Sequence, residues 1–187
     1  MAAKKSETLI LLSGGIDSTA CLNFYLEEKH NVKAVLVNYG QVAFKKELVA
    51  VKAICNYFSV NYKIVTVKAK LPNKSGFVMG RNMFLLSTAL VYGEVESGFI
   101  STGLHSGTNY SDCSEVFVDR MRSLFEIYTH GRLQIGTPFI KWSKGEIWRY
   151  CKMKKVPLEL TYSCELGLKQ PCTKCSSCKD LIKLNAG

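Results

Sequence analysis

The chain has 187 residues, 47% of them hydrophobic, which suffices for one substantial core and is too little for two full-size domains. It contains no run of 18 or more apolar residues and no signal-peptide core, so we expect a cytoplasmic protein with no membrane segment. Lysine and arginine number 25 against 15 acidic residues, and this net charge of +10 favours anionic partners. The basic residues are scattered along the chain, which argues against a nucleic-acid partner.

Short apolar runs alternate with segments of helical periodicity along most of the chain. Expected strands cover residues 8–12, 32–38, 62–67, 99–103 and 133–139, and expected helices cover 17–29, 44–58, 81–97, 114–130 and 143–154. Strands that alternate with helices form parallel sheets with right-handed crossovers, so the pattern predicts a doubly wound, Rossmann-like α/β fold. Helical periodicity stops after Pro157 and cysteines crowd. We therefore predict a main domain over 1–156 and a small C-terminal zinc-binding helical appendage over 157–187.

The first expected strand runs directly into the sequence Ser-Gly-Gly-Ile-Asp-Ser-Thr at residues 13–19. Glycines let the backbone approach an anion closely, and the N–H groups that open the next helix add positive potential. Asp17 suits a Mg²⁺ ion held against phosphates. A plain glycine turn is the alternative, but the residue order favours phosphate binding. The predicted phosphate site comprises Leu12, Ser13, Gly14, Gly15, Ile16, Asp17, Ser18 and Thr19.

Four cysteines lie within fifteen residues near the C-terminus, as Cys164-x7-Cys172-x2-Cys175-x2-Cys178. Tight Cys-x-x-Cys steps let thiolates converge on one tetrahedral ion, so these four are the predicted ligands of a structural zinc. An iron–sulfur cluster or unpaired buried thiols remain alternatives. The other cysteines in helical segments, Cys21, Cys55 and Cys151, are expected in the core.

The loop at 13–18 resembles that of the N-type ATP pyrophosphatases, since no Gly-x-x-x-x-Gly-Lys-Ser/Thr motif is present. Together with the cysteine tail, the chain resembles the 7-cyano-7-deazaguanine synthases of the queuosine pathway. The further markers are Tyr39-Gly40-Gln41 with Glu47, Phe77-Val78-Met79-Gly80-Arg81-Asn82, Gly103 and His105, Asp112-Cys113, and Leu158 through Cys164, in this order.

The resemblance implies that ATP binds with its adenine near the ends of the first two strands, beside Tyr39 and Gln41. It also implies that the carboxylate of a 7-deazapurine is adenylated, that ammonia gives an amide, and that a second activation gives the nitrile. A homodimer is implied as well. Lys144 resembles a family lysine that holds pyrophosphate, although a surface lysine is an alternative. With Asp17 and Arg81 it forms the predicted catalytic set.

The residues expected to bind the substrate are polar or aromatic and follow strands or open helices: Arg81, Asn82, His105, Tyr110, Asp112 and Phe117. Arg81 and Asn82 suit a phosphate or a developing oxyanion, and His105 suits a base contact or a proton relay. Tyr110 and Phe117 suit stacking on a planar ring. A solvated helix start, a satisfied polar histidine and core aromatics are the plain alternatives.

The chain departs from the family at Asn38 and Ala43, where an acidic residue and a histidine are usual. The family's Asp-Cys-Arg-Pro-Glu-Phe segment is Asp-Cys-Ser-Glu-Val-Phe here, at residues 112–117, and the stretch 68–76 is shorter. This leaves the substrate open. The alternatives are an enzyme that stops at the amide or adenylates another carboxylate, and a tRNA-thiolating or RNA-binding zinc protein. A thiolase would need Cys113 and Cys151 as its catalytic pair.

Overall fold

A computed structural model describes residues 5–68, 78–108 and 110–186. Within these ranges, five parallel strands form one sheet in the order β3-β2-β1-β4-β5. The strands are β1 (Glu7–Leu11), β2 (Asn31–Asn38), β3 (Asn61–Thr66), β4 (Gly98–Ser101) and β5 (Leu133–Gly136). The strand order reverses beside β1, so β1 and β4 border the topological switch point, where such sheets bind ligands. The predicted doubly wound α/β fold is confirmed.

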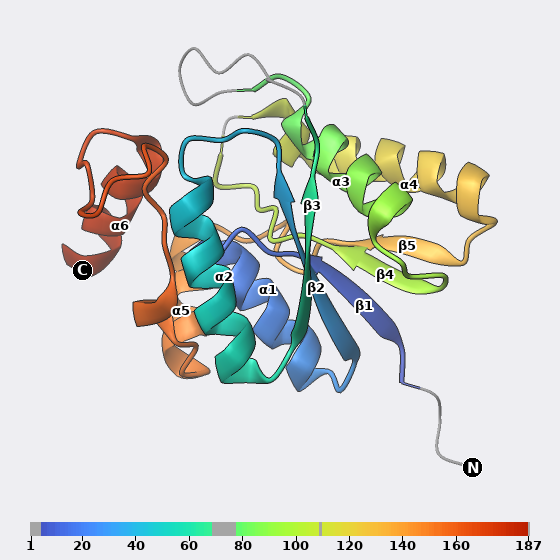
Figure 1. The fold of residues 1–187 in the computed structure, drawn as a ribbon, viewed down its shortest axis with the longest axis horizontal. Coiled ribbons are helices and arrows are strands. Elements are labelled where there is room, and N and C mark those ends of the chain that lie inside the picture. The colour runs from blue at the N-terminus through green and yellow to red at the C-terminus, as the bar shows by residue number, and fades with distance from the viewer. Residues whose placement is uncertain (1–4, 69–77, 109, 187) are drawn as a thin grey trace.

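Helices cover both faces of the sheet (Figure 1). One face carries α1 (Ile16–Glu27), α2 (Phe44–Phe58) and α5 (Lys144–Met153), and the other carries α3 (Arg81–Tyr92) and α4 (Glu115–Thr129). Single turns of 3₁₀ helix form at η1 (Ser111–Cys113) and η2 (Leu158–Leu160), and α6 (Ser176–Ala186) is the last helix described.

The central strands β1 and β2 are rich in apolar residues because each contributes to two cores. Ile10 of β1 and Leu36 of β2 pack in the cluster beneath α1, α2 and α5, whereas Leu9 and Val35 pack in the cluster beneath α3 and α4. Alternate residues of a strand point to opposite faces, so a strand buried on both sides has no polar positions to spare. The two cores fix the positions of the strand ends and of the loops that follow them.

Two expected boundaries are wrong. The helix expected over 81–97 ends at Tyr92, because a side chain at Gly93 would lie 2.3 Å from both the Ala89 oxygen and Leu9 Cδ2, so only glycine lets the chain turn there. The strand expected over 133–139 ends at Gly136, since Pro138 has no N–H to donate and a turn links the Ile140 N–H to the Thr137 oxygen.

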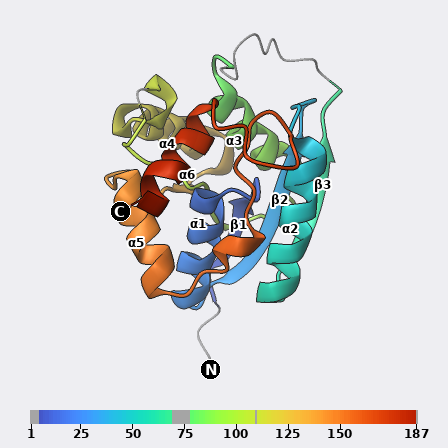
Figure 2. The ribbon, with the colours of Figure 1, turned by 90° about the vertical axis from the view of Figure 1, so that its left-hand side faces the viewer.

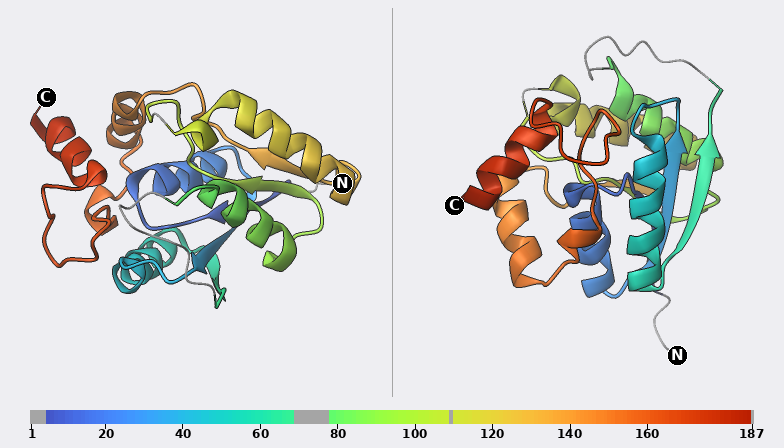
Figure 3. Two further views of the ribbon diagram at one scale, coloured as in Figure 1. Left: turned by 90° about the horizontal axis from the view of Figure 1, so that it is seen from above. Right: turned by 60° about the vertical axis from the view of Figure 1, so that its left-hand side comes forward.

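The segment after Pro157 crosses back toward the carboxyl edge of the sheet, with α6 near α5 (Figures 2 and 3). Leu158, Leu160 and Leu181 pack against the core beneath α1 and α2, and the Tyr162 N–H donates to the Gly14 oxygen at 2.8 Å. The helical appendage expected after Pro157 is confirmed by α6. The division at residue 156 stays a prediction.

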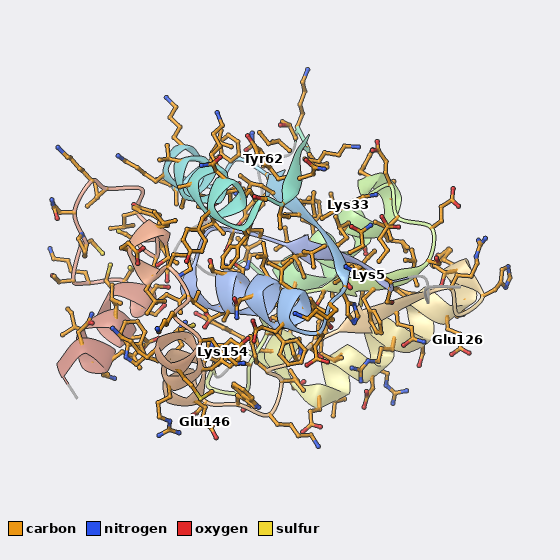
Figure 4. The ribbon with its side chains drawn as sticks, turned by 90° about the horizontal axis from the view of Figure 1, so that it is seen from below. Lys5, Lys33, Tyr62, Glu126, Glu146 and Lys154 are labelled. Atoms are coloured by element: carbon orange, nitrogen blue, oxygen red, sulfur yellow. The ribbon has the colours of Figure 1, made fainter. Side chains whose placement is uncertain are left out.

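Charged side chains spread over many elements, in keeping with the scattered basic residues of the sequence. Lys33 of β2 pairs with Glu7, and Lys154, just after α5, pairs with Glu27; both lysines are labelled in Figure 4. None of the helices that the structure describes has the length and apolar character needed to cross a membrane.

Candidate functional site

A cavity of about 330 Å³ opens at the carboxyl ends of β1, β2 and β4, at the topological switch point. Its walls come from the loop after β1, the turn after β2, the start of α3, the segment after β4, the start of α5 and the cysteine tail. Among the predicted catalytic, ATP-binding and substrate-binding residues, those that line it are Leu12, Ser13, Gly15, Ile16, Asp17, Ser18, Tyr39, Gln41, Arg81, Asn82, His105, Tyr110 and Lys144, and the predicted metal ligand Cys164 lines it too. Gly14, Thr19, Asp112 and Phe117 are not part of the lining.

The loop after β1 is held in shape by its own hydroxyl groups and by a glycine. Gly14 has a φ of +81°, and a Cβ there would lie 2.8 Å from Ala50 Cβ, so the loop needs glycine both for its backbone and for its contact with α2. Ser18 Oγ lies 3.2 Å from Ser13 Oγ and donates to the Gly15 oxygen at 3.1 Å. Thr19 is fully buried and donates to the same oxygen at 2.8 Å, so it supports the loop from beneath.

Asp17 and Lys144 form an ion pair inside the cavity, although 127 residues separate them. Lys144 Nζ lies 2.6 Å from Asp17 Oδ1 and also contacts Oδ2, and the two side chains are 23% and 28% exposed. Lys144 opens α5, whose start is fixed by a capping box between Ser143 and Glu146. The pair therefore places one fixed cation and one carboxylate beside the glycine loop.

His105, in the segment after β4, lies beside this ion pair. Its Nε2 lies 3.8 Å from Asp17 Oδ2, and its Nδ1 accepts the Gly107 N–H at 3.1 Å, so the neutral ring carries its proton on Nε2. Burial lowers the pKa of His105, and the nearby Asp17 carboxylate opposes that effect only in part. At neutral pH the imidazole is therefore a neutral donor directed at the loop.

Gly103 allows β4 and the loop to approach each other closely. A Cβ at this position would lie 2.4 Å from the Asp17 backbone oxygen, far inside van der Waals contact. The absence of a side chain at Gly103 therefore sets how near His105 can lie to Asp17.

The turn after β2 forms a second polar wall. Gln41 Nε2 donates to Glu47 Oε2 at 2.8 Å and to the Val37 oxygen at 2.9 Å, while its Oε1 accepts the Tyr39 N–H at 2.9 Å. Burial raises the pKa of Glu47, an effect that the Gln41 hydrogen bond and the Arg81 charge only partly offset. Burial also raises the pKa of Tyr39, against the opposing Arg81 charge. Arg81 thus lies near a half-buried tyrosine and a half-buried carboxyl group.

Asn82, at the start of α3, is hydrogen-bonded to η1. Its side-chain amide donates to the Asp112 oxygen at 3.0 Å, and its backbone N–H donates to Asp112 Oδ2 at 3.2 Å. Cys113 follows, buried and in the cavity wall. Asp112 is therefore a structural partner of Asn82.

The residues that depart from the family pattern after Cys113 face away from the cavity. Ser114 caps α4 by accepting the Phe117 N–H at 3.2 Å, and Glu115 pairs with Lys141 at 3.3 Å on the surface. Val116 is 70% exposed, and Phe117 packs against the core beneath α4. Residues 69–77, which include the marker Phe77 and most of the shortened stretch, lie outside the described residues.

The four predicted metal ligands come together. The Sγ atoms of Cys164, Cys172, Cys175 and Cys178 all lie within 4.8 Å of one another, and those of Cys172 and Cys178 are 3.8 Å apart. A tetrahedral zinc with bonds of about 2.3 Å separates its sulfurs by about 3.8 Å, so the donor set fits one zinc ion. A four-iron cluster binds each thiolate to a different iron and needs a wider spacing.

Backbone N–H groups lower the pKa of one of these four thiols. The N–H groups of Cys175 and Lys174 lower the pKa of Cys172 to about 6, which favours the thiolate form that a metal binds. Cys21, Cys55 and Cys151 are buried in the core, as the sequence predicts. Cys113 belongs to the opposite core from Cys151, so the two do not form a pair.

The cysteine tail is also a wall of the cavity, which the sequence did not indicate. Tyr162, Ser163, Glu165, Ser177 and Asp180 all line it. Tyr162 and Ser163 belong to the marker segment Leu158 through Cys164, whereas no motif marks Glu165, Ser177 or Asp180, which reach the site only when the tail folds back over the loop. The one sequence signal for these three residues is the carboxylate of Asp180, two positions after the predicted metal ligand Cys178.

The chain matches the protein family described as queuosine biosynthesis protein QueC over residues 7–75 and 68–181. It is 30% identical to a 7-cyano-7-deazaguanine synthase of a Marinomonas species, over 95% of this chain and 92% of the relative. It is 32% identical to the 7-cyano-7-deazaguanine synthase of Acetivibrio thermocellus, over 91% of this chain and 88% of that protein.

Solved structures that share the fold include the U34-tRNA thiolase NcsA of Methanococcus maripaludis with its [4Fe-4S] cluster, at 22% identity. That match has a TM-score of 0.56 and covers 96% of this chain and 64% of the thiolase. A 4-thiouridine synthetase in complex with RNA and ATP matches at 23% identity with a TM-score of 0.53, over 97% of this chain and 50% of the synthetase. At these identities the likeness establishes the fold alone.

Proposed function

Since the chain belongs to the queuosine biosynthesis protein QueC family, we propose that it is an ATP-dependent carbon–nitrogen ligase that makes 7-cyano-7-deazaguanine from 7-carboxy-7-deazaguanine and ammonia. The observation that carries the proposal is one cavity at the switch point that combines a glycine loop, a fixed lysine and a separate polar wall. Such a cavity has room for a triphosphate on one side and a second ring on the other.

In this proposal the loop at 13–18 and Lys144 bind the β- and γ-phosphates. The N–H groups at the start of α1 and the Lys144 ammonium offset the charge of the departing pyrophosphate. The adenine lies against the apolar ends of β1 and β2, beside Tyr39. Asp17 would hold a Mg²⁺ ion, which would neutralise part of the phosphate charge.

The reaction requires two activations. A carboxylate oxygen of the substrate attacks the α-phosphorus of ATP, and pyrophosphate leaves. Ammonia then attacks the acyl carbon, and AMP leaves to give the amide. The amide oxygen attacks a second ATP in the same way, and loss of AMP with the amide protons gives the nitrile. Arg81 stabilises negative charge on the oxygen under attack, and the His105 Nε2–H donates to a phosphate oxygen near Asp17.

The cysteine cluster is proposed to hold a structural zinc, because four thiolates leave no open coordination position. Its contribution is to hold the tail against the loop, where Tyr162 contacts Gly14. We further propose a cytoplasmic homodimer, as the family resemblance implies.

The alternative outcomes have less support. An enzyme that stops at the amide was suggested by the altered segment 112–117, but Ser114, Glu115, Val116 and Phe117 do not line the cavity. The substitutions there alter a helix cap and a surface pair. A thiolase relative would need a pair of catalytic cysteines, and Cys113 and Cys151 lie in separate cores.

The test is to incubate the protein with 7-carboxy-7-deazaguanine, ATP, Mg²⁺ and ammonium, and to follow the products by mass spectrometry. We expect the nitrile, together with two AMP and two pyrophosphate for each nitrile formed, and no product when ammonium is omitted. The amide as the sole final product would support the amide-forming alternative. Release of no product lighter than the acid would refute both.

A further inference from the structure

We propose that Asp180 of α6 is the residue that recognises the ring of the substrate, by accepting hydrogen bonds from its N1–H and 2-amino groups. The inference rests on the proposed function, because it concerns the guanine-type ring of 7-carboxy-7-deazaguanine. It assigns substrate specificity to the cysteine tail, which the proposed function treats only as a support.

Four carboxyl groups line the cavity among the residues the structure describes: Asp17, Glu47, Glu165 and Asp180. Three of them are already bound to protein groups. Asp17 is held by Lys144, and Glu47 accepts the Gln41 amide at 2.8 Å. Glu165 Oε1 accepts from the hydroxyl groups of Ser176 and Ser177 at 2.8 and 2.7 Å, and from the Ser177 N–H at 3.3 Å, so it caps α6.

Asp180 differs from the other three. Over residues 5–68, 78–108 and 110–186, no hydrogen bond or ion pair involves its carboxylate. It is half-buried in the cavity wall, one turn along α6 from Ser176. Its charge reaches His105, since it raises the pKa of that imidazole against the larger effect of burial. The carboxylate therefore borders the same cavity as His105 and retains its full capacity to accept hydrogen bonds.

Two parts of the cavity wall suit different rings. The end of β2 contributes the apolar residues Val35, Leu36 and Val37, to which α3 adds Leu85, and this part of the wall suits the adenine of ATP. The tail contributes polar residues, among them Ser163, Ser177 and Asp180. The tail meets the loop at 13–18, where the Tyr162 N–H donates to the Gly14 oxygen, so a ring bound by the tail would lie close to phosphates bound by the loop.

The chemistry of the ring requires an acceptor-only partner. A guanine-type ring presents N1–H and the 2-amino group side by side, and the two oxygens of one carboxylate accept both. A ring without the 2-amino group offers only one of these donors. Asparagine keeps the size of aspartate, but it replaces one acceptor with an NH₂ group that opposes the ring N–H. The residue should therefore control affinity and also the preference for the 2-amino group.

The experiment measures ring binding by calorimetry for the wild type and for Asp180→Asn, with 7-carboxy-7-deazaguanine and with its analogue that lacks the 2-amino group. Asp180→Asn should weaken binding of the acid about 10- to 100-fold and should weaken binding of the analogue less. Affinity for ATP should not change. Asp119→Asn is the matched control, because Asp119 is exposed on α4 and pairs only with Arg122 there.

Zinc content and thermal melting of each variant are measured alongside, since Asp180 follows Cys178 closely. If Asp180→Asn loses the metal, Asp180→Glu is used in its place and should bind the acid more weakly than the wild type while keeping the preference for the 2-amino group. Unchanged affinity and unchanged preference in a metal-loaded variant would overturn the inference and leave the proposed function intact. A wild type that binds ATP but not the acid would overturn the proposed function itself.

Discussion

Replacing Asp17 with asparagine removes a negative charge from an anion-binding loop and frees Lys144 from its ion pair. We expect two effects of opposite sign. With Mg²⁺ chelated, Asp17→Asn should bind ATP more tightly than the wild type, because Lys144 is then available to the phosphates. With Mg²⁺ present, the variant should lose turnover, because the ion loses its protein carboxylate.

The size of the first effect follows from the burial of the pair. Lys144 Nζ lies 2.6 Å from Asp17 Oδ1, and the side chains are 23% and 28% exposed. An exposed pair contributes about 0–1 kcal/mol, and breaking a buried one costs about 3–5 kcal/mol. A pair between these limits is worth about 1–2 kcal/mol. Since about 1.4 kcal/mol is a factor of ten, metal-free ATP should bind about 5- to 30-fold more tightly.

The assay is calorimetric titration of ATP in excess EDTA at constant ionic strength. Glu27→Gln is the matched control, because it removes the same charge from a surface pair, in which Lys154 Nζ lies 2.7 Å from Glu27 Oε2. The control should bind ATP with wild-type affinity. Equal or weaker metal-free binding by Asp17→Asn, with the control unchanged, would falsify the view that Asp17 and the phosphates compete for Lys144.

The remaining predictions concern the metal, the packing of the loop and the titration of His105. Cys172→Ser should lose its zinc, measured by elemental analysis, together with several kcal/mol of stability, because apparent binding energies of structural zinc are about 10–16 kcal/mol. Gly103→Ala should cost about 1–3 kcal/mol in urea unfolding, because its Cβ would lie 2.4 Å from the Asp17 oxygen. Burial lowers the pKa of His105, so the unfolded chain takes up that proton first as pH falls. The wild type should therefore lose stability relative to His105→Gln between about pH 7 and 5, measured by urea unfolding at each pH.

Each of these has an outcome that contradicts it. Full zinc content in Cys172→Ser would exclude that thiol as a ligand. Gly145→Ala, where an added Cβ meets nothing within 4 Å, is the control for Gly103→Ala, and equal stability of the two variants would show that the loop tolerates the contact. Parallel pH profiles for the wild type and His105→Gln would show that the imidazole titrates alike in the folded and unfolded states.

The fold could be predicted from the sequence because local and global signals agree. The strand that carries Ile10 and the strand that carries Leu36 each have apolar residues at consecutive positions, as expected of a sheet covered on both faces. The early end of α3 was missed because Gly93 acts through a contact with Leu9, a residue far away in the sequence. A periodicity pattern contains no information on such contacts.

The candidate site also has parts that could be predicted from the sequence and parts that could not. The glycine loop and the four cysteines were predictable because their spacing alone encodes the geometry that an anion or a metal needs. The partnership of Asp17 with Lys144 was not, since it depends on α5 beginning at the carboxyl edge of the sheet. Phe117 was expected at the ring and packs in the core, because an aromatic residue inside an amphipathic helix has the same sequence signal in both roles.

The return of the tail over the loop has a consequence for how such an enzyme can be changed. The residues proposed to hold ATP all precede Pro157, whereas the tail that completes the cavity follows it and is attached by the core contact of Leu158 and the hydrogen bond from Tyr162 to Gly14. The two parts can vary independently as long as these attachments persist. Exchange of the tail alone is then a direct route to ligases that activate other carboxylic acids with the same nucleotide machinery.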